Sequence, residues 1–108
     1  MLELYQTEWC PSSRRVRQRL MELGLDYLMR QVPVERSDRA ALVAATGTDS
    51  VPALVLGDGT ALVGDDAIFA YLDGFDEPAE AEAHRLRAAK ARRRYLEEEC
   101  ECSQVVTR

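Results

Sequence analysis

The chain has 108 residues, 46% of them hydrophobic, which is enough for one compact domain with a buried core. Its 14 basic and 19 acidic residues give a net charge of −5, which argues against a dedicated nucleic-acid-binding protein with a clustered basic face. No apolar run approaches the roughly 20 residues of a membrane span, and the N-terminus has neither the basic region nor the cleavage site of a signal peptide. We therefore expect no nucleic-acid and no membrane partner. We also expect a monomer, and the use of only three cysteines indicates the cytoplasm.

The first predicted strand and helix flank a turn that contains a cysteine. Residues 2–6 are mostly apolar, as in a buried central strand, and a helical pattern begins at Pro11 and ends near Gly24. The apolar stripe of this helix is Val16, Leu20 and Leu23. Its four arginines are expected to form mostly a solvated face, with Arg14 able to help hold an anion near the cysteine; they are Arg14, Arg15, Arg17 and Arg19.

Cys10 is the residue that comes directly before this helix. The unpaired N–H groups and the positive dipole end of a helix stabilise negative charge, so a thiol at this position forms a thiolate more readily. The alternative is a buried cysteine that packs as a small hydrophobic residue. A polar turn that opens a helix is an unusual place for a core cysteine, so we predict that Cys10 is reactive.

The middle of the chain alternates between strand and helix patterns. Residues 26–34 predict a second strand near a sheet edge, because Pro33 lacks an N–H group. Ser37 or Asp38 is expected to cap a short helix that ends at Thr46-Gly47. Residues 51–56 and 61–63 are expected to form an antiparallel hairpin, followed by a helix that opens at Gly64-Asp65-Asp66. This order predicts an α/β fold with a mixed four-stranded sheet and helices on both faces.

The composition changes after residue 77. Residues 79–99 are rich in Ala, Glu and Arg and contain no Gly or Pro, which predicts a long helix. We therefore expect a domain over residues 1–77, a helical extension over 78–102 and a frayed tail over 103–108.

Four separated motifs give the first 77 residues a resemblance to known proteins. Cys10-Pro11-Ser12-Ser13 is similar to the Cys-Pro-x-Cys or Cys-Pro-x-Ser site of glutaredoxins, and Ser50-Val51-Pro52 is similar to their Thr-Val-Pro segment. Asp65-Asp66 is similar to the Ser/Thr/Cys-Asp pair of the same family, and Arg39 has the spacing of a basic residue thirteen positions before the proline. The chain thus resembles glutaredoxins and the N-terminal domain of glutathione transferases, which both have a thioredoxin-like fold.

The resemblance implies glutathione, or another thiol with a γ-glutamyl end, as co-substrate. It implies a cis Val51–Pro52 bond facing Cys10, with the peptide groups of Val51 pairing with the cysteinyl part of the ligand. It also implies that the helix N-terminus at Asp65 and Asp66 binds the γ-glutamyl carboxylate, that the Asp66 side chain binds the ammonium group, and that Arg39 binds the glycyl carboxylate. The alternatives are that Asp65 is only an N-cap and Arg39 only a surface charge.

Ser13 occupies the position of the second cysteine of a dithiol site. The resemblance therefore implies a monothiol glutaredoxin-like oxidoreductase, in which Cys10 exchanges disulfides with thiolated proteins and Ser13 donates a hydrogen bond to the thiolate. Thr7 replaces the usual glutaredoxin lysine, and Val63-Gly64 replaces a Gly-Gly pair. Two alternatives remain open: a carrier of glutathione or an iron–sulfur cluster, although the Cys-Gly-Phe-Ser signature is absent, and a binding or regulatory module similar to a truncated transferase.

Cys100 and Cys102 form the only other cysteine-containing segment. Two cysteines are at best half of a metal site, and the three cysteines of the chain are too few for a disulfide framework, so we predict no metal site and a reducing compartment. We expect a reduced, exposed pair. The alternative is that one of the two resolves a mixed disulfide on Cys10.

Overall fold

The computed structural model describes residues 1–97. The chain divides into two compact units, the first formed by Met1–Glu77 and the second beginning at Pro78. Among the described residues, no helix has both the length and the apolar character required to cross a membrane.

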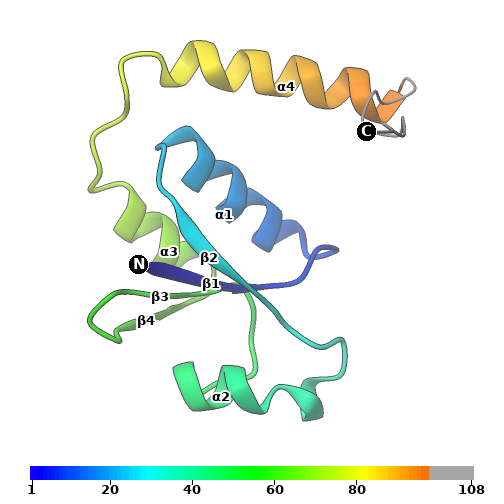
Figure 1. Ribbon diagram of the computed structural model, residues 1–108, viewed down its shortest axis with the longest axis vertical. Helices are drawn as coiled ribbons and strands as arrows, with labels where there is room; N and C mark the ends of the chain where they lie inside the picture. The colour runs from blue at the N-terminus through cyan, green and yellow to red at the C-terminus, as the bar shows by residue number, and fades with distance from the viewer. Residues whose placement is uncertain (98–108) are drawn as a thin grey trace, which may run out of the picture. The chain divides into compact units, whose positions relative to one another are not determined.

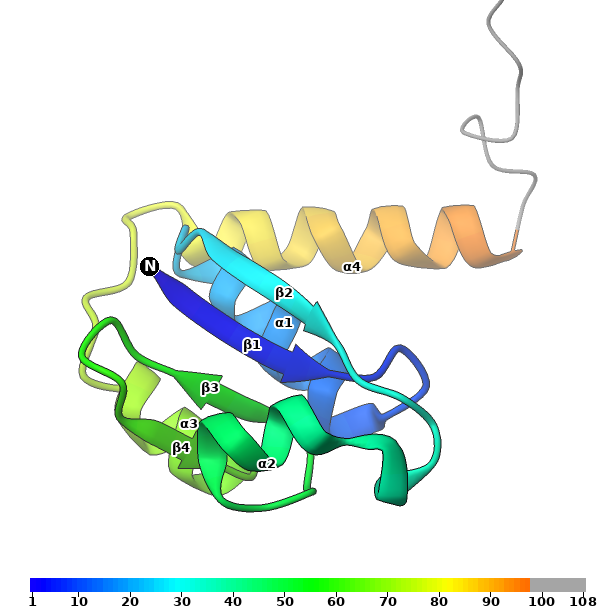
Figure 2. The same cartoon turned by 60° about the horizontal axis from the view of Figure 1, so that its bottom comes forward.

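The first unit is built on a four-stranded sheet with the strand order β2-β1-β3-β4 (Figures 1 and 2). The central strand β1 (Leu2–Gln6) runs parallel to β2 (Tyr27–Gln31) and antiparallel to β3 (Ala53–Val55). The strand β4 (Ala61–Val63) returns antiparallel to β3 through the predicted turn. The predicted mixed sheet is confirmed, and β2 lies at its edge as Pro33 indicated.

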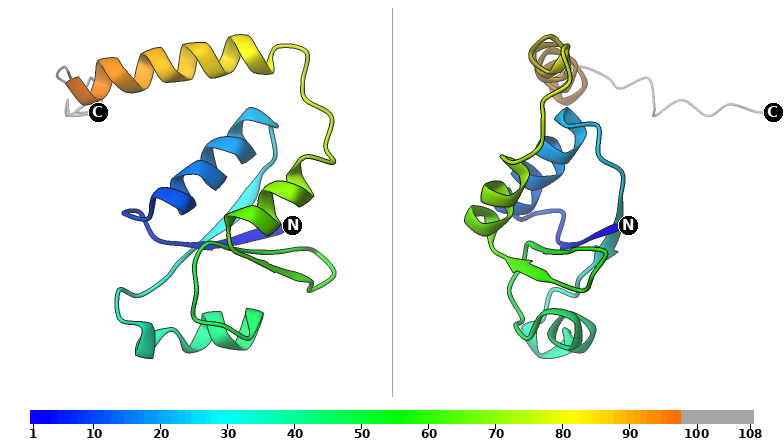
Figure 3. Two further views of the ribbon diagram at one scale, coloured as in Figure 1. Left: turned by 180° about the vertical axis from the view of Figure 1, so that it is seen from behind. Right: turned by 90° about the vertical axis from the view of Figure 1, so that its left-hand side faces the viewer.

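Helices cover both faces of this sheet (Figure 3). One face is covered by α1 (Pro11–Glu22) and α3 (Asp65–Leu72), and the other by α2 (Ala40–Thr46). Successive side chains of a strand point to opposite faces, so the two faces of the sheet contribute to two separate cores. The larger core, beneath α1 and α3, consists of Leu4, Val16, Leu20, Leu23, Leu54, Ile68 and Leu72. The smaller core, beneath α2, consists of Val32, Leu42 and Ala53.

The start of α2 differs from the prediction. Ser37 and Asp38 do not cap the helix, because they lie in a 3₁₀ turn over Arg36–Asp38. Arg39 is the N-cap residue, and its side chain makes no capping hydrogen bond. Gly47 ends the helix in the left-handed conformation, with φ of 80°, as the Thr46-Gly47 pair predicted.

In the second unit, α4 (Ala81–Glu97) lies within the range predicted for a long helix. Its residues have high helix propensity and include no Gly or Pro, which explains the agreement. The predictions for Cys100, Cys102 and the tail over 103–108 lie outside the described residues.

Candidate active site around Cys10

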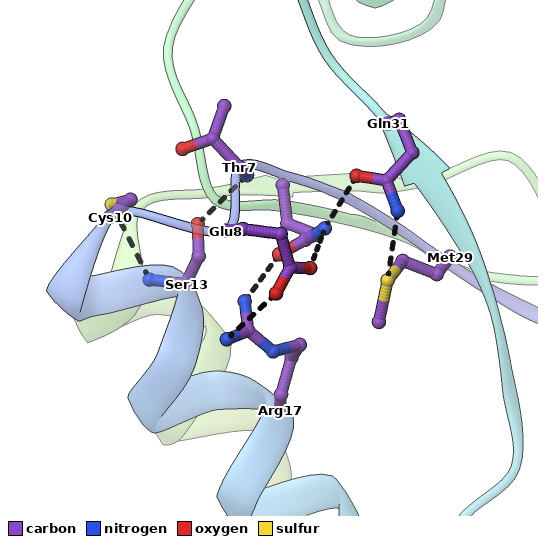
Figure 4. A network of polar contacts seen from close by, with 8 residues as sticks. Thr7, Glu8, Cys10, Ser13, Arg17, Met29 and Gln31 are labelled. Atoms are coloured by element: carbon purple, nitrogen blue, oxygen red, sulfur yellow. Dashed lines mark hydrogen bonds and ion pairs between the residues drawn. The ribbon is translucent and has the colours of Figure 1, made fainter. Parts of the chain in front are cut away.

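Cys10 is the N-cap residue of α1, with an extended backbone at φ −78° and ψ 119°. Its Sγ accepts a hydrogen bond from the backbone N–H of Ser13 at 3.4 Å (Figure 4). Pro11 occupies the first position of the helix, where a missing N–H has no cost. The thiol therefore takes the place of the side-chain oxygen that usually caps a helix, and it is partly exposed to solvent.

The surroundings of Cys10 favour its thiolate. Partial burial raises the pKa of the thiol, but hydrogen bonds from the Ser13 hydroxyl and from the backbone N–H groups of Ser13 and Ser12 lower it. The positive charge of Arg15 lowers it further, so the pKa of Cys10 lies below its ordinary value. Helix-terminal N–H groups and one nearby cation thus supply the stabilisation expected of a reactive cysteine.

Ser13 is fully buried beneath the turn that presents Cys10. Its hydroxyl accepts a hydrogen bond from the backbone N–H of Thr7 at 3.4 Å, while the carbonyl of Thr7 accepts from the N–H of Cys10 at 3.3 Å. Ser13 therefore holds the end of β1 against the start of α1, in addition to its contact with the thiol. Sequence reasoning assigned Ser13 to the thiolate but missed this second role, because it depends on how the turn closes.

Three of the four arginines of α1 form ion pairs. Arg15 is exposed, as the predicted solvated face requires, but the side chains of Arg17 and Arg19 are only 17% and 16% exposed, so that prediction is wrong for these two. Arg15 pairs with Asp65 at 2.9 Å, Arg17 with Glu8 at 3.7 Å, and Arg19 with Glu77 at 2.7 Å. The arginine whose charge lowers the pKa of Cys10 is Arg15, whereas the sequence had singled out Arg14 as the one that could help hold an anion near the thiol. Asp65 and Glu77 are distant from α1 in sequence, so helical periodicity alone carried no signal for these pairs.

Asp65 connects the N-terminal ends of α3 and α1. Its Oδ2 accepts hydrogen bonds from Ser12 Oγ and from Arg15 Nη2, each at 2.9 Å, and Arg15 Nη2 also contacts Ser12 Oγ at 2.9 Å. The hydrogen bonds from Arg15 and Ser12 lower the pKa of the Asp65 carboxyl. The alternative that Asp65 is an N-cap is wrong, because Gly64 is the N-cap residue and α3 has no side-chain cap.

The three remaining predicted residues lie in the cis-proline loop, at Val51 and Pro52, and at the start of α3, at Asp66. The Val51–Pro52 peptide bond is cis, as the resemblance implied, and the carbonyl of Pro52 accepts a hydrogen bond from the N–H of Gly64 at 2.9 Å. Asp66 is exposed, and within the described part of the chain its carboxylate makes no hydrogen bond or ion pair. The bonds Ser12–Asp65 and Gly64–Pro52 thus bring the cysteine turn, the start of α3 and the cis-proline loop together.

Arg39 has a different environment from the predicted one. Its side chain is buried, with 7% of the residue exposed, so the alternative of a surface charge is wrong. Its guanidinium donates to the carbonyls of Pro33 at 2.9 Å, Val34 at 3.2 Å and Asp49 at 2.8 Å. Arg39 therefore ties the segment after β2 to the segment that leads into Val51–Pro52.

Residues 1–97 include no group of three or more His, Cys, Asp or Glu side chains arranged to hold a metal ion. The candidate site contains a thiol, helix-terminal N–H groups, and charged side chains on α1 and α3.

Residues 4–79 match the family model described as the N-terminal domain of glutathione S-transferase. The chain belongs to this family. Its Cys10 turn, cis-proline loop and α3 all lie within the matched residues. Among proteins with curated descriptions, none matches the chain.

Solved structures agree with the family assignment. A glutathione S-transferase domain-containing protein from Marinobacter aquaeolei is 35% identical with a TM-score of 0.60, and the match covers 71% of this chain and 40% of that one. A glutathione transferase homologue from Sulfitobacter, solved with bound glutathione, is 31% identical with a TM-score of 0.59. The match covers 67% of this chain and 35% of the homologue. A thioredoxin-like protein with 23% identity and a TM-score of 0.57 confirms the thioredoxin-like fold. The chain spans less than half the length of the two transferase relatives.

Proposed function

We propose that this domain binds glutathione, or a thiol with a similar γ-glutamyl end, beside Cys10, and that Cys10 performs monothiol–disulfide exchange. The observation that carries the proposal is the position of the thiol as the N-cap of α1, where the N–H of Ser13 donates to Sγ. A lowered pKa increases the thiolate fraction near neutral pH, and the thiolate is the attacking species.

The reaction has two exchange steps. The Cys10 thiolate attacks the glutathione sulfur of a mixed disulfide, forms a Cys10–glutathione disulfide and releases the substrate as a thiolate. A second glutathione thiolate then attacks the glutathione sulfur on Cys10, which releases oxidised glutathione and regenerates the Cys10 thiolate. Each step breaks one S–S bond and forms another, so no further oxidant or reductant is needed. Ser13 has no thiol, so it stabilises the thiolate and does not resolve the disulfide.

The ligand is proposed to lie between the cis-proline loop and the start of α3. The N–H and C=O groups of Val51 make no backbone hydrogen bond within residues 1–97, so they are available to pair with an extended peptide. The N-terminal N–H groups of α3 suit a carboxylate, and the exposed Asp66 suits an ammonium group. Related transferases from Sulfitobacter and Methylobacillus flagellatus were solved with glutathione bound, which supports this choice of ligand.

For Arg39 we propose a supporting role in place of the predicted contact with the glycyl carboxylate. Three of its five guanidinium donors already bind backbone carbonyls, and the side chain is buried. It would act by holding the loop that leads into Val51–Pro52.

The test is an exchange assay with a glutathionylated peptide, a panel of low-molecular-weight thiols and the Cys10→Ser variant. We expect glutathione-dependent turnover by the wild type and none by Cys10→Ser. A matched control replaces both Cys100 and Cys102 with serine, and it should retain full turnover. Absence of turnover in the wild type, or equal turnover in Cys10→Ser, would contradict the proposal.

A second candidate function is glutathione binding without turnover. It is favoured by the pairing of Arg15 with Asp65, which offsets the nearby positive charge, and by Thr7 at the position of a lysine. In this case calorimetry would show that wild type and Cys10→Ser bind glutathione with similar affinity, while neither turns over a mixed disulfide.

A further inference from the structure

A cluster of polar side chains lies beside the Cys10 turn, between α1 and the ends of β1 and β2 (Figure 4). It is centred on Gln6, the last residue of β1, which is fully buried. The other members are Glu8 in the turn, Arg17 on α1, and Gln31 at the end of β2. No member touches the thiol, so the cluster is not explained by the chemistry proposed for Cys10.

Gln6 is held in one orientation by its partners. Its amide nitrogen donates to Glu8 Oε1 and to Gln31 Oε1, each at 3.0 Å, and its amide oxygen accepts from Arg17 Nη1. A buried amide group without a hydrogen-bond partner destabilises the fold by its full desolvation free energy. The observed orientation of the Gln6 amide is therefore strongly preferred over the orientation with its oxygen and nitrogen exchanged. Only an amide with its oxygen toward Arg17 satisfies all three contacts, because a guanidinium cannot accept a hydrogen bond.

Arg17 therefore holds both neighbours of Thr7. Its guanidinium contacts Gln6 through Nη1 and lies 3.7 Å from the Glu8 carboxylate through Nη2. Thr7 itself is buried, and its hydroxyl is without a hydrogen-bond partner among the described residues, so its side chain does not fix its position by hydrogen bonding. The backbone of Thr7 contacts Ser13 through its N–H and Cys10 through its carbonyl.

We propose that Arg17 is a positioning residue for the Cys10 thiolate. By fixing Gln6 and Glu8 it keeps the Thr7 peptide groups on Ser13 and Cys10, and this keeps the N–H of Ser13 directed at Sγ. Arg17 lies one helical turn after Ser13, so the positioning residue and the N–H group that it keeps in place belong to the same helix, α1. The inference rests on the proposed function, because it concerns the thiol that performs the exchange.

Two substitutions of Arg17 separate the effect of the guanidinium's planar shape on Cys10 from the effect of its positive charge. Arg15, and not Arg17, is the arginine whose charge acts on Cys10. Arg17→Lys keeps the positive charge but loses the planar fork that reaches Gln6 and Glu8 together. Arg17→Gln removes both the charge and the fork.

The experiment measures the rate of Cys10 alkylation by iodoacetamide against pH, in a background with Cys100 and Cys102 replaced by serine. We expect Arg17→Lys and Arg17→Gln to shift the profile to higher pH, with a fall of about fivefold in the rate at pH near 7, the size of one weakened hydrogen bond. Glu8→Gln leaves an acceptor for Gln6 and should have a smaller effect in the same direction.

Arg30→Gln is the matched control. Arg30 forms an ion pair with Glu3 at 2.9 Å between β2 and β1, away from the Cys10 turn, and its loss should leave the alkylation profile unchanged. An unchanged profile in both Arg17 variants would overturn the inference, as would a profile shifted in Arg17→Gln but normal in Arg17→Lys, since charge alone would then explain it. Alkylation needs no glutathione, so the result stands apart from the exchange assay that tests the proposed function.

Discussion

Replacement of Arg39 by glutamine separates a structural role from a ligand-binding role. The side chain donates to three carbonyls at 2.8, 2.9 and 3.2 Å, and hydrogen bonds to a charged group contribute roughly 1.5–3 kcal/mol each. Pro33 and Val34 are exposed residues. In the variant, water can therefore replace the guanidinium at their carbonyls, which reduces the loss of folding stability. We therefore expect Arg39→Gln to lower the free energy of unfolding by about 2–4 kcal/mol, well below the sum of the three contacts.

Thermal unfolding followed by circular dichroism measures this loss. For a domain of this size, about 2–4 kcal/mol corresponds to a fall in Tm of roughly 10 to 25 °C. Arg36→Gln is the matched control, because Arg36 is an exposed arginine in the same segment. Its ion pair with Asp49 at 3.6 Å should contribute less than about 1 kcal/mol. An Arg39→Gln protein with the Tm of the wild type and a large loss of glutathione affinity would refute this reasoning and restore the predicted contact with a carboxylate.

Gly64, Asp65 and Cys10 should each give a distinct result in unfolding experiments. Gly64→Ala should cost about 1–3 kcal/mol because φ is 90°, although no atom lies within 4 Å of the added Cβ. Gly57→Ala, where φ is not positive, should change little, and equal losses at both would contradict this. Asp65 has a pKa below its ordinary 3.8, so its stabilisation is present above that value and lost in acid. The Tm difference between wild type and Asp65→Asn should therefore disappear as pH falls, and a constant difference would argue against the ion pair. Cys10 has a pKa below its ordinary 9.0, so wild type should gain stability over Cys10→Ser as pH rises toward 9.0, and parallel profiles would contradict the lowered pKa.

The sheet and the position of the thiol could be predicted because local patterns determine them. The mostly apolar composition of β1 and the turn before β4 are local features of the sequence. So is the periodic spacing of Val16, Leu20 and Leu23 along α1 and its C-cap. Cys10 was placed correctly because a helix N-terminus is itself a local feature, marked by Pro11. The cis Val51–Pro52 bond came from resemblance alone.

The partners of the arginines could not be predicted, because the fold brings them from distant parts of the chain. Arg15 meets Asp65 and Arg19 meets Glu77 only after α1 packs beside α3 and the segment that follows it. For Arg39 the partners are backbone carbonyls, which have no signature in the sequence at all. The alternative that Asp65 is an N-cap is wrong because Gly64 precedes the helix as its N-cap, and the Asp65 carboxylate binds Ser12 and Arg15 on α1 instead.

The two outer strands of the sheet leave backbone N–H and C=O groups that could pair with a strand from another molecule. β4 has only three residues, so it offers a very short template. β2 is longer, but Arg30 on it is charged, exposed and paired with Glu3, and a charged side chain on an edge strand opposes addition of an apolar strand. Both edges therefore disfavour intermolecular sheet growth.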